Sequence, residues 1–72
     1  MSPVHWRRLV RVFERDGFVH IRTRGDHLVY DKPGTKRSLI IPMYRQVPVF
    51  IIEGLLRTAG MSRVRYFELL HS

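Results

Sequence analysis

The residues best suited to chemistry lie in the stretch 23–30. Within it, Gly25 and Asp26 follow Arg24 and predict a tight turn. This turn brings His27 to the start of a short run of strand-forming residues. An imidazole titrates near neutral pH and can therefore take up or release a proton under physiological conditions. We interpret His27 as the candidate active centre.

Side chains that can bind an anion accompany this histidine. Guanidinium groups offer paired N–H donors that match phosphate oxygens and can stabilise negative charge in a transition state. A loop tyrosine, Tyr44, can stack on an unpaired base or assist proton transfer. The candidates for binding phosphate or RNA are Arg22, Arg24, Gly25, Arg37, Tyr44 and Arg45.

The register of the second strand decides which side chains stand beside His27. Neighbouring strand residues point to opposite faces, so burial of Leu28 and Tyr30 would turn His27 outward beside Arg22 and Arg24. The alternative register would bury Val29. Asp26 also has two interpretations, an orienting partner of His27 or a turn-capping carboxylate, and the sequence favours the second.

No group of ligands is spaced to converge on a metal ion, and cysteine is absent. We therefore expect no metal and no other cofactor. The alternative interpretation of His27 is an exposed strand histidine that has no functional role. His5, His20 and His71 have no supporting context and are expected to be surface or partly packed residues.

Composition favours nucleic acid as the partner. The chain has 72 residues, a formal net charge of +7 and eleven arginines among its thirteen basic residues. Small basic domains also bind acidic proteins or anionic membranes, so those alternatives remain open. We expect one domain over residues 1–72, a reducing cytoplasm as its compartment, no signal peptide and no membrane-spanning segment.

Helical periodicity predicts a first helix over residues 3–16. Ser2 followed by Pro3 is typical of a helix start, and Asp16 with Gly17 supplies a stop. The apolar stripe consists of Trp6, Leu9, Val10 and Phe13. The other side carries Arg7, Arg8, Arg11 and Arg15, which are either a solvated face or contacts to phosphates.

The middle of the chain predicts three antiparallel strands. From Phe18 the pattern alternates, which predicts a strand to residue 24 that buries one side and turns basic residues outward. Strands over 27–31 and 37–41 follow, and the last ends at Pro42. Turns at 24–26 and 32–36 connect them.

Two helices complete the chain. The first is predicted from Pro48 to Ala59, with close packing as the expected reason for a glycine at position 54 that costs about 1 kcal/mol relative to alanine. A short helix follows Ser62, with two possible buried faces. These faces are Val64, Phe67 and Leu70, or Tyr66, Leu69 and Leu70. The aromatic residues expected in the core are Trp6, Phe13, Tyr30, Phe50 and Phe67.

The predicted fold class is therefore α+β, with the order α-β-β-β-α and a short C-terminal helix. A three-stranded antiparallel sheet carries the helices on one face and leaves its other face open for a ligand.

This order of elements, with particular residues, resembles the HicA family of toxin endoribonucleases from prokaryotic toxin–antitoxin systems. The residues that carry the resemblance are Asp16-Gly17-Phe18, Arg24-Gly25-Asp26-His27-Leu28-Val29-Tyr30, Ile41-Pro42, Leu55-Leu56-Arg57-Thr58-Ala59-Gly60-Met61 and Phe67. The resemblance implies a fold similar to a double-stranded-RNA-binding domain, metal-independent cleavage of mRNA and neutralisation by a HicB-like antitoxin. It assigns the family's active histidine to His27 and allows a homo-oligomer or a hetero-oligomer with the antitoxin.

The chain departs from the family pattern at two places. Many relatives have a second histidine after the proline of the third strand, where this chain reads Pro42-Met43-Tyr44-Arg45. The second helix begins Pro48-Val49-Phe50-Ile51-Ile52 in place of a basic, glycine-containing start. The alternatives to an endoribonuclease are therefore a non-catalytic RNA-binding module and a protein-interaction domain that meets an acidic partner.

Overall fold

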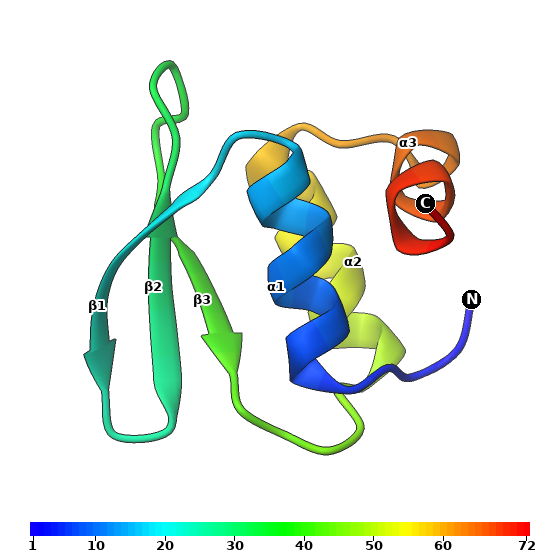
Figure 1. The fold of residues 1–72 in the computed structure, drawn as a ribbon, viewed down its shortest axis with the longest axis horizontal. Coiled ribbons are helices and arrows are strands. Elements are labelled where there is room, and N and C mark those ends of the chain that lie inside the picture. The colour runs from blue at the N-terminus through cyan, green and yellow to red at the C-terminus, as the bar shows by residue number, and fades with distance from the viewer.

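A three-stranded antiparallel sheet packs against two helices, and a third helix lies on the far side of the first two (Figure 1). The computed structural model describes residues 1–72. The elements are α1 (Trp6–Arg15), β1 (Val19–Arg24), β2 (His27–Asp31), β3 (Leu39–Pro42), α2 (Val49–Ala59) and α3 (Arg63–Leu70). This architecture confirms the predicted α+β class and element order.

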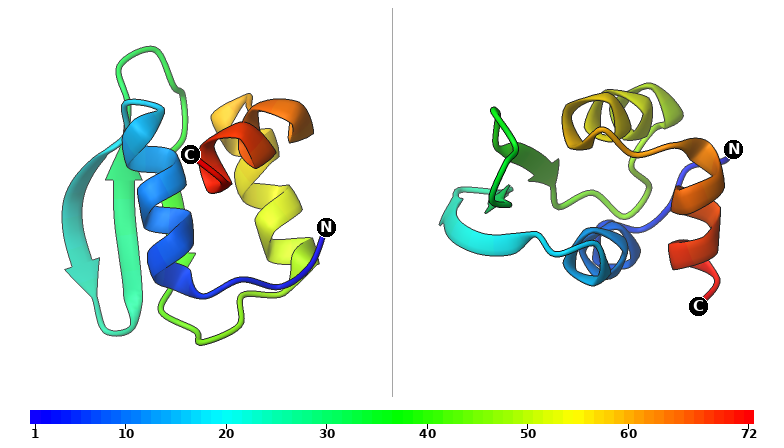
Figure 2. Two further views of the ribbon diagram at one scale, coloured as in Figure 1. Left: turned by 45° about the vertical axis from the view of Figure 1, so that its right-hand side comes forward. Right: turned by 90° about the horizontal axis from the view of Figure 1, so that it is seen from above.

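The sheet is buried on one face only. Its strands are ordered β1-β2-β3, and α1 and α2 both contact β3 (Figure 2). Leu28 and Tyr30 of β2 and Leu39 and Ile41 of β3 belong to the core under the helices. The register that buries Leu28 and Tyr30 is therefore confirmed, and no helix covers the opposite face (Figures 1 and 2).

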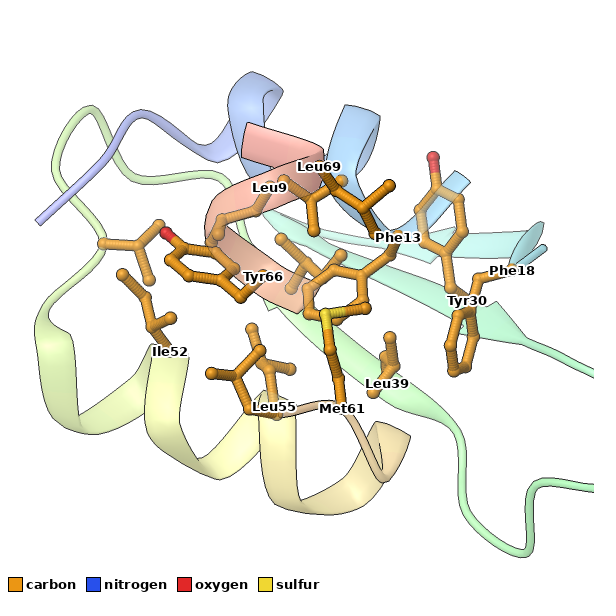
Figure 3. Packing of buried hydrophobic residues seen from close by; sticks show 14 of the residues in the cluster. Leu9, Phe13, Phe18, Tyr30, Leu39, Ile52, Leu55, Met61, Tyr66 and Leu69 are labelled. Carbon is orange, nitrogen blue, oxygen red and sulfur yellow. The ribbon is translucent and has the colours of Figure 1, made fainter. Parts of the chain in front are cut away.

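Aromatic and aliphatic side chains from all three helices fill the core (Figure 3). Phe13 packs edge-on against Phe18 with ring centroids 5.8 Å apart. Of the two faces predicted for the last helix, the one with Tyr66 and Leu69 is buried, and Val64 is 71% exposed. Phe50, which was expected in the core, is 71% exposed, so that prediction is wrong, and Phe67 lies at the edge of the core with 36% exposure.

The first helix starts three residues later than predicted. His5 is its N-cap, and Nδ1 of His5 accepts a hydrogen bond from the backbone N–H of Arg7 at 3.1 Å. The preceding segment is extended because Val4 forms a bridge to Val47, in which each backbone N–H donates to the carbonyl of the other residue. This pairing holds residues 2–4 out of the helix, so Ser2 and Pro3 do not start it.

The first strand does not bury one side, contrary to the prediction. All six residues of β1 are exposed, including Val19 at 59% and Ile21 at 47%. β1 is the edge strand farthest from the helices, so an alternating pattern has no core to face. A bulge between His20 and Arg22 also interrupts the alternation.

The third strand is shorter than predicted at its start. It begins at Leu39 and leaves Arg37 and Ser38 in the loop. The Ser38 hydroxyl donates to the Asp31 carboxylate and closes the base of this loop. The second helix ends as predicted at Gly60, which adopts a left-handed conformation with φ 65°.

Candidate active site

The candidate histidine stands at the end of the β1–β2 hairpin. Arg24 and His27 are directly paired across the two strands, and only Gly25 and Asp26 connect them. Gly25 has φ 60°, which a glycine adopts without the steric cost that a Cβ would bring. The sequence 24–27 therefore folds into a two-residue turn that fixes where His27 enters β2.

The imidazole of His27 is accessible and has a carboxylate partner. Its side chain is 45% exposed, and Nδ1 lies 2.9 Å from Oδ1 of Asp26. Nδ1 therefore faces the Asp26 carboxylate, which leaves Nε2 as the ring nitrogen without a partner in the protein. Of the two interpretations of Asp26, the structure supports the orienting partner, which the sequence had not favoured.

Strand pairing brings two of the predicted arginines to the same face as His27. Residues directly opposite each other in an antiparallel pair share a face, and Arg24 is opposite His27 while Arg22 is opposite Val29. Both arginines are exposed. The result is an imidazole with Arg24 directly across from it and Arg22 two residue pairs further along the strands.

Apolar residues of β2 and β3 lie beside His27 and the two arginines on the open face of the sheet. Val29 is only 3% exposed although it lies outside the core under the helices, and its partners are Arg22 on one side and Ile40 on the other. Pro42 pairs with His27 and is also buried. The centre of the open face is therefore apolar, with Val29 buried and Ile40 46% exposed, and the arginines of this face lie on β1.

The loop after β3 returns to the same end of the sheet. The backbone N–H of Met43 donates to the carbonyl of Asp26 at 2.8 Å, so the loop continues the pairing beside the β1–β2 turn. The next residues, Tyr44 and Arg45, are exposed. The Tyr44 carbonyl accepts from the Trp6 N–H at 3.1 Å, which fixes the loop to the start of α1.

Arg37 is not part of this group. It precedes Leu39, which pairs with Tyr30, whereas His27 pairs with Pro42 at the opposite end of β2. Three residues of strand separate the two ends by roughly 10 Å, and Arg37 lies two residues further on. The structure therefore places Arg24, Gly25 and the loop residue Tyr44 at the His27 end and Arg22 in the middle of the sheet, and it leaves Arg37 at the other end. Arg45 is exposed in the same loop as Tyr44.

No three side chains of His, Cys, Asp or Glu gather where they could hold a metal ion. The chain also has no helix with the length and apolar character needed to cross a membrane.

A family model described as the HicA toxin of bacterial toxin–antitoxin systems matches residues 6–61. The chain belongs to the HicA toxin family. The match covers α1, the whole sheet and α2 and ends just before α3. The family consists of toxins of bacterial toxin–antitoxin systems, and a comparison of this HicA-family chain with curated proteins finds no match.

Sequence reasoning weighed two features of the site in this HicA-family chain incorrectly. It treated burial of Val29 as an alternative to burial of Leu28 and Tyr30, whereas all three residues are buried, and periodicity alone does not separate these cases. It also favoured a turn-capping role for Asp26 over the contact with His27, for which the short turn was an available signal. In a two-residue turn the second residue directly precedes the strand, so its side chain stands beside the first strand residue.

Proposed function

We propose that this toxin is an endoribonuclease that cleaves single-stranded regions of mRNA without a metal ion. The observation that carries the proposal is the accessible imidazole of His27 with Asp26 at Nδ1 and Arg24 directly across the strand pair. RNA carries its own nucleophile, the 2′-hydroxyl. The protein must therefore supply only proton transfer and positive charge next to the phosphate.

The reaction follows from the groups at this end of the sheet. Nε2 of neutral His27 accepts the proton of the 2′-hydroxyl as the 2′-oxygen attacks phosphorus. The bond from phosphorus to the 5′-oxygen breaks, which yields a 2′,3′-cyclic phosphate and a 5′-hydroxyl end. The leaving oxygen takes its proton from the imidazolium just formed or from the hydroxyl of Tyr44.

The remaining residues have separate roles in this proposal. Arg24 and Arg22 bind the scissile phosphate and stabilise the charge of the pentacovalent transition state. Arg45 binds an adjacent phosphate, and Tyr44 stacks on an unpaired base. Gly25 has no side chain, so the turn leaves room for the RNA backbone to approach. The HicB-like antitoxin inhibits the toxin by covering the same face in the cytoplasm.

The decisive experiment compares His27→Ala with His20→Ala on an unstructured RNA in EDTA. His20 is the matched control because it is exposed on the same hairpin but pairs with Tyr30, on the face toward the helices. We expect His27→Ala to lower cleavage by about 10²–10⁴-fold and His20→Ala to leave it nearly unchanged. Equal cleavage by both variants would remove His27 from the mechanism.

Two further results would change the assignment. RNA binding by the wild type in a gel shift without any cleavage would indicate a binding module, in line with the absent second histidine near Tyr44. Cleavage that disappears in EDTA and returns with Mg²⁺ would contradict the metal-independent reaction. Tyr44→Phe distinguishes the two candidate proton donors, the His27 imidazolium and the Tyr44 hydroxyl. Cleavage should fall in this variant only if the Tyr44 hydroxyl protonates the leaving oxygen.

A further inference from the structure

A second cationic site lies at the end of the sheet opposite to His27. A hollow of about 760 Å³ opens between the β2–β3 loop and the C-terminal half of α2. Its charged lining residues are Lys36 and Arg37 from the loop and Arg57 from the helix. The other lining residues are small or carry hydroxyls, and none is acidic.

These three cations have no counter-ion within the protein. None of the four salt bridges includes Lys36, Arg37 or Arg57. Five of the six carboxylates are engaged elsewhere, namely Glu14 with Tyr30, Asp16 with Lys32 and Arg65, Asp26 with His27, Asp31 with Ser38 and Glu53 with Arg63. The hollow is therefore a concentration of unbalanced positive charge, which attracts anions.

A glycine in the middle of α2 opens onto this hollow. The sequence predicted that Gly54 is tolerated because another element packs closely against it, and that prediction is wrong. A Cβ built at Gly54 would approach no atom nearer than Nη2 of Arg57, at 3.9 Å. The glycine, which costs about 1 kcal/mol in a helix, therefore has no packing reason, and it leaves the surface of α2 open beside Arg57.

The hollow connects to the open face of the sheet. Residues 34–37 line the hollow and also line a neighbouring groove, whose other lining residues are Val19, Ile21, Asp31, Lys32, Pro33 and Ser38. Arg22 lies between this groove and His27, because it pairs with Val29 in the middle of β2. Cations therefore lie at both ends of this path, Arg22 and Arg24 near His27 and Lys32, Lys36 and Arg37 at the groove, and the groove also holds the Asp31 carboxylate, which accepts from Ser38.

The structure assigns this hollow to a backbone phosphate of the RNA, at a position remote from the bond that is cleaved. This inference rests on the proposed ribonuclease function. A polar hollow with a single hydrophobic lining residue fits phosphate oxygens better than an anchor side chain of a protein, because the centres of protein interfaces are apolar and rich in aromatics. RNA bound at both sites spans the sheet from end to end.

The test compares RNA substrates of different lengths. A dinucleotide has one phosphodiester and can occupy only the His27 site, whereas a longer RNA can also reach the hollow. We expect Arg37→Gln and Arg57→Gln to raise KM severalfold on the longer RNA, with kcat unchanged, and to leave cleavage of the dinucleotide as in the wild type. Arg65→Gln, which removes a charge paired with Asp16, is the matched control and should change neither.

A binding measurement keeps this inference separate from the ribonuclease proposal. Fluorescence anisotropy with a 2′-O-methyl RNA in a His27→Ala background reports phosphate contacts whether or not the chain cleaves RNA. Each lost contact should lower the slope of log affinity against log salt by about 0.7. Gly54→Glu, which places a carboxylate in the hollow, should have the same effect, and Gly54→Ala should not.

Unchanged salt slopes in all three variants would overturn the assignment, even if His27→Ala abolishes cleavage. Normal RNA binding together with weakened binding of the antitoxin would overturn it as well, because the hollow would then accept acidic side chains of a protein. Circular dichroism of Gly54→Glu would show whether α2 is intact, and the two arginine variants do not depend on that result.

Discussion

Oδ1 of Asp26 lies 2.9 Å from Nδ1 of His27, although the two residues are neighbours in the chain. The contact arises because Asp26 is the last residue of a two-residue turn and His27 the first residue of β2. Both side chains are largely exposed, so the pair is screened by water and adds little to stability. In the proposed mechanism, its role is to hold one tautomer and one orientation of the imidazole.

Asp26→Asn should therefore affect activity more than stability. The amide keeps the shape of the side chain but loses the charge that favours a proton on Nδ1. We expect a loss of cleavage smaller than that of His27→Ala, with the melting temperature nearly unchanged. Nitrogen NMR of the imidazole gives an independent readout. In Asp26→Asn, the fraction of His27 rings that carry a proton on Nδ1 should be smaller than in the wild type. Unaltered ring signals would contradict an orienting role, and Asp31→Asn at the other end of β2 is the control.

Stability should fall at alkaline pH because of Tyr30. Burial and a hydrogen bond from its hydroxyl to Oε2 of Glu14, at 3.0 Å, raise the pKa of Tyr30 to about 12. The unfolded tyrosine ionises near pH 10. The stabilisation is thus complete below pH 10 and is lost as pH rises from 10 to 12, by up to about 2–3 kcal/mol.

Urea unfolding at pH 9, 10 and 11 measures this loss. In Tyr30→Phe the free energy of unfolding should fall less steeply over this pH range, because the hydroxyl that ionises is absent. Tyr44→Phe is the control, since Tyr44 is exposed and should leave the decline as in the wild type. A decline that is equally steep in Tyr30→Phe would assign it to other groups.

The sequence predicts the order and type of every element because each carries its own local signals. Glycines at turns and helix ends, the hydroxyl of Ser62 and the β-branched run after Phe18 act over a few residues and need no knowledge of the fold. The helix start at Trp6 was missed because it depends on a bridge between Val4 and Val47, which are far apart in the chain. No local pattern reports such a pairing.

The residues of the candidate site also fall into those that local sequence places and those that only strand pairing places. His27, Arg24 and Gly25 belong to one turn, so their proximity follows from sequence. Arg37 was grouped with them by charge alone, and only the pairing of β2 with β3 shows that it lies at the opposite end. The exposed sides of β1 were missed for a related reason, because an alternating pattern does not reveal whether anything covers the strand.

Two arginines of α1 have a structural role. The sequence had predicted that they form either a solvated face or contacts to phosphates, and it had not predicted this role. Nη1 of Arg15 donates to the carbonyl of Leu69 at 3.0 Å, and Nη2 of Arg8 donates to that of Leu70 at 3.4 Å. The last carbonyls of a helix lack intrahelical partners and carry partial negative charge, so these bonds stabilise the end of α3.

Arg15→Ala should loosen α3 without abolishing the fold. We expect a loss of about 1 kcal/mol and faster amide hydrogen exchange in α3 than in the sheet. Arg11→Ala removes an exposed arginine of the same helix for which no such bond is present, and it should leave exchange in α3 unchanged. Equal exchange in both variants would indicate that Arg15 contributes nothing to α3.

Tyr66→Phe should stabilise the protein, in contrast to Tyr30→Phe. Tyr66 is fully buried in the core, and its hydroxyl has no hydrogen-bond partner (Figure 3). A buried hydroxyl without a partner costs about 1–3 kcal/mol, so replacing it with hydrogen should raise the melting temperature by several degrees. At neutral pH, Tyr30→Phe should lower it, because Glu14 loses a donor. Thermal denaturation of the two variants measures both signs, and a loss of stability in Tyr66→Phe would mean that its hydroxyl is satisfied.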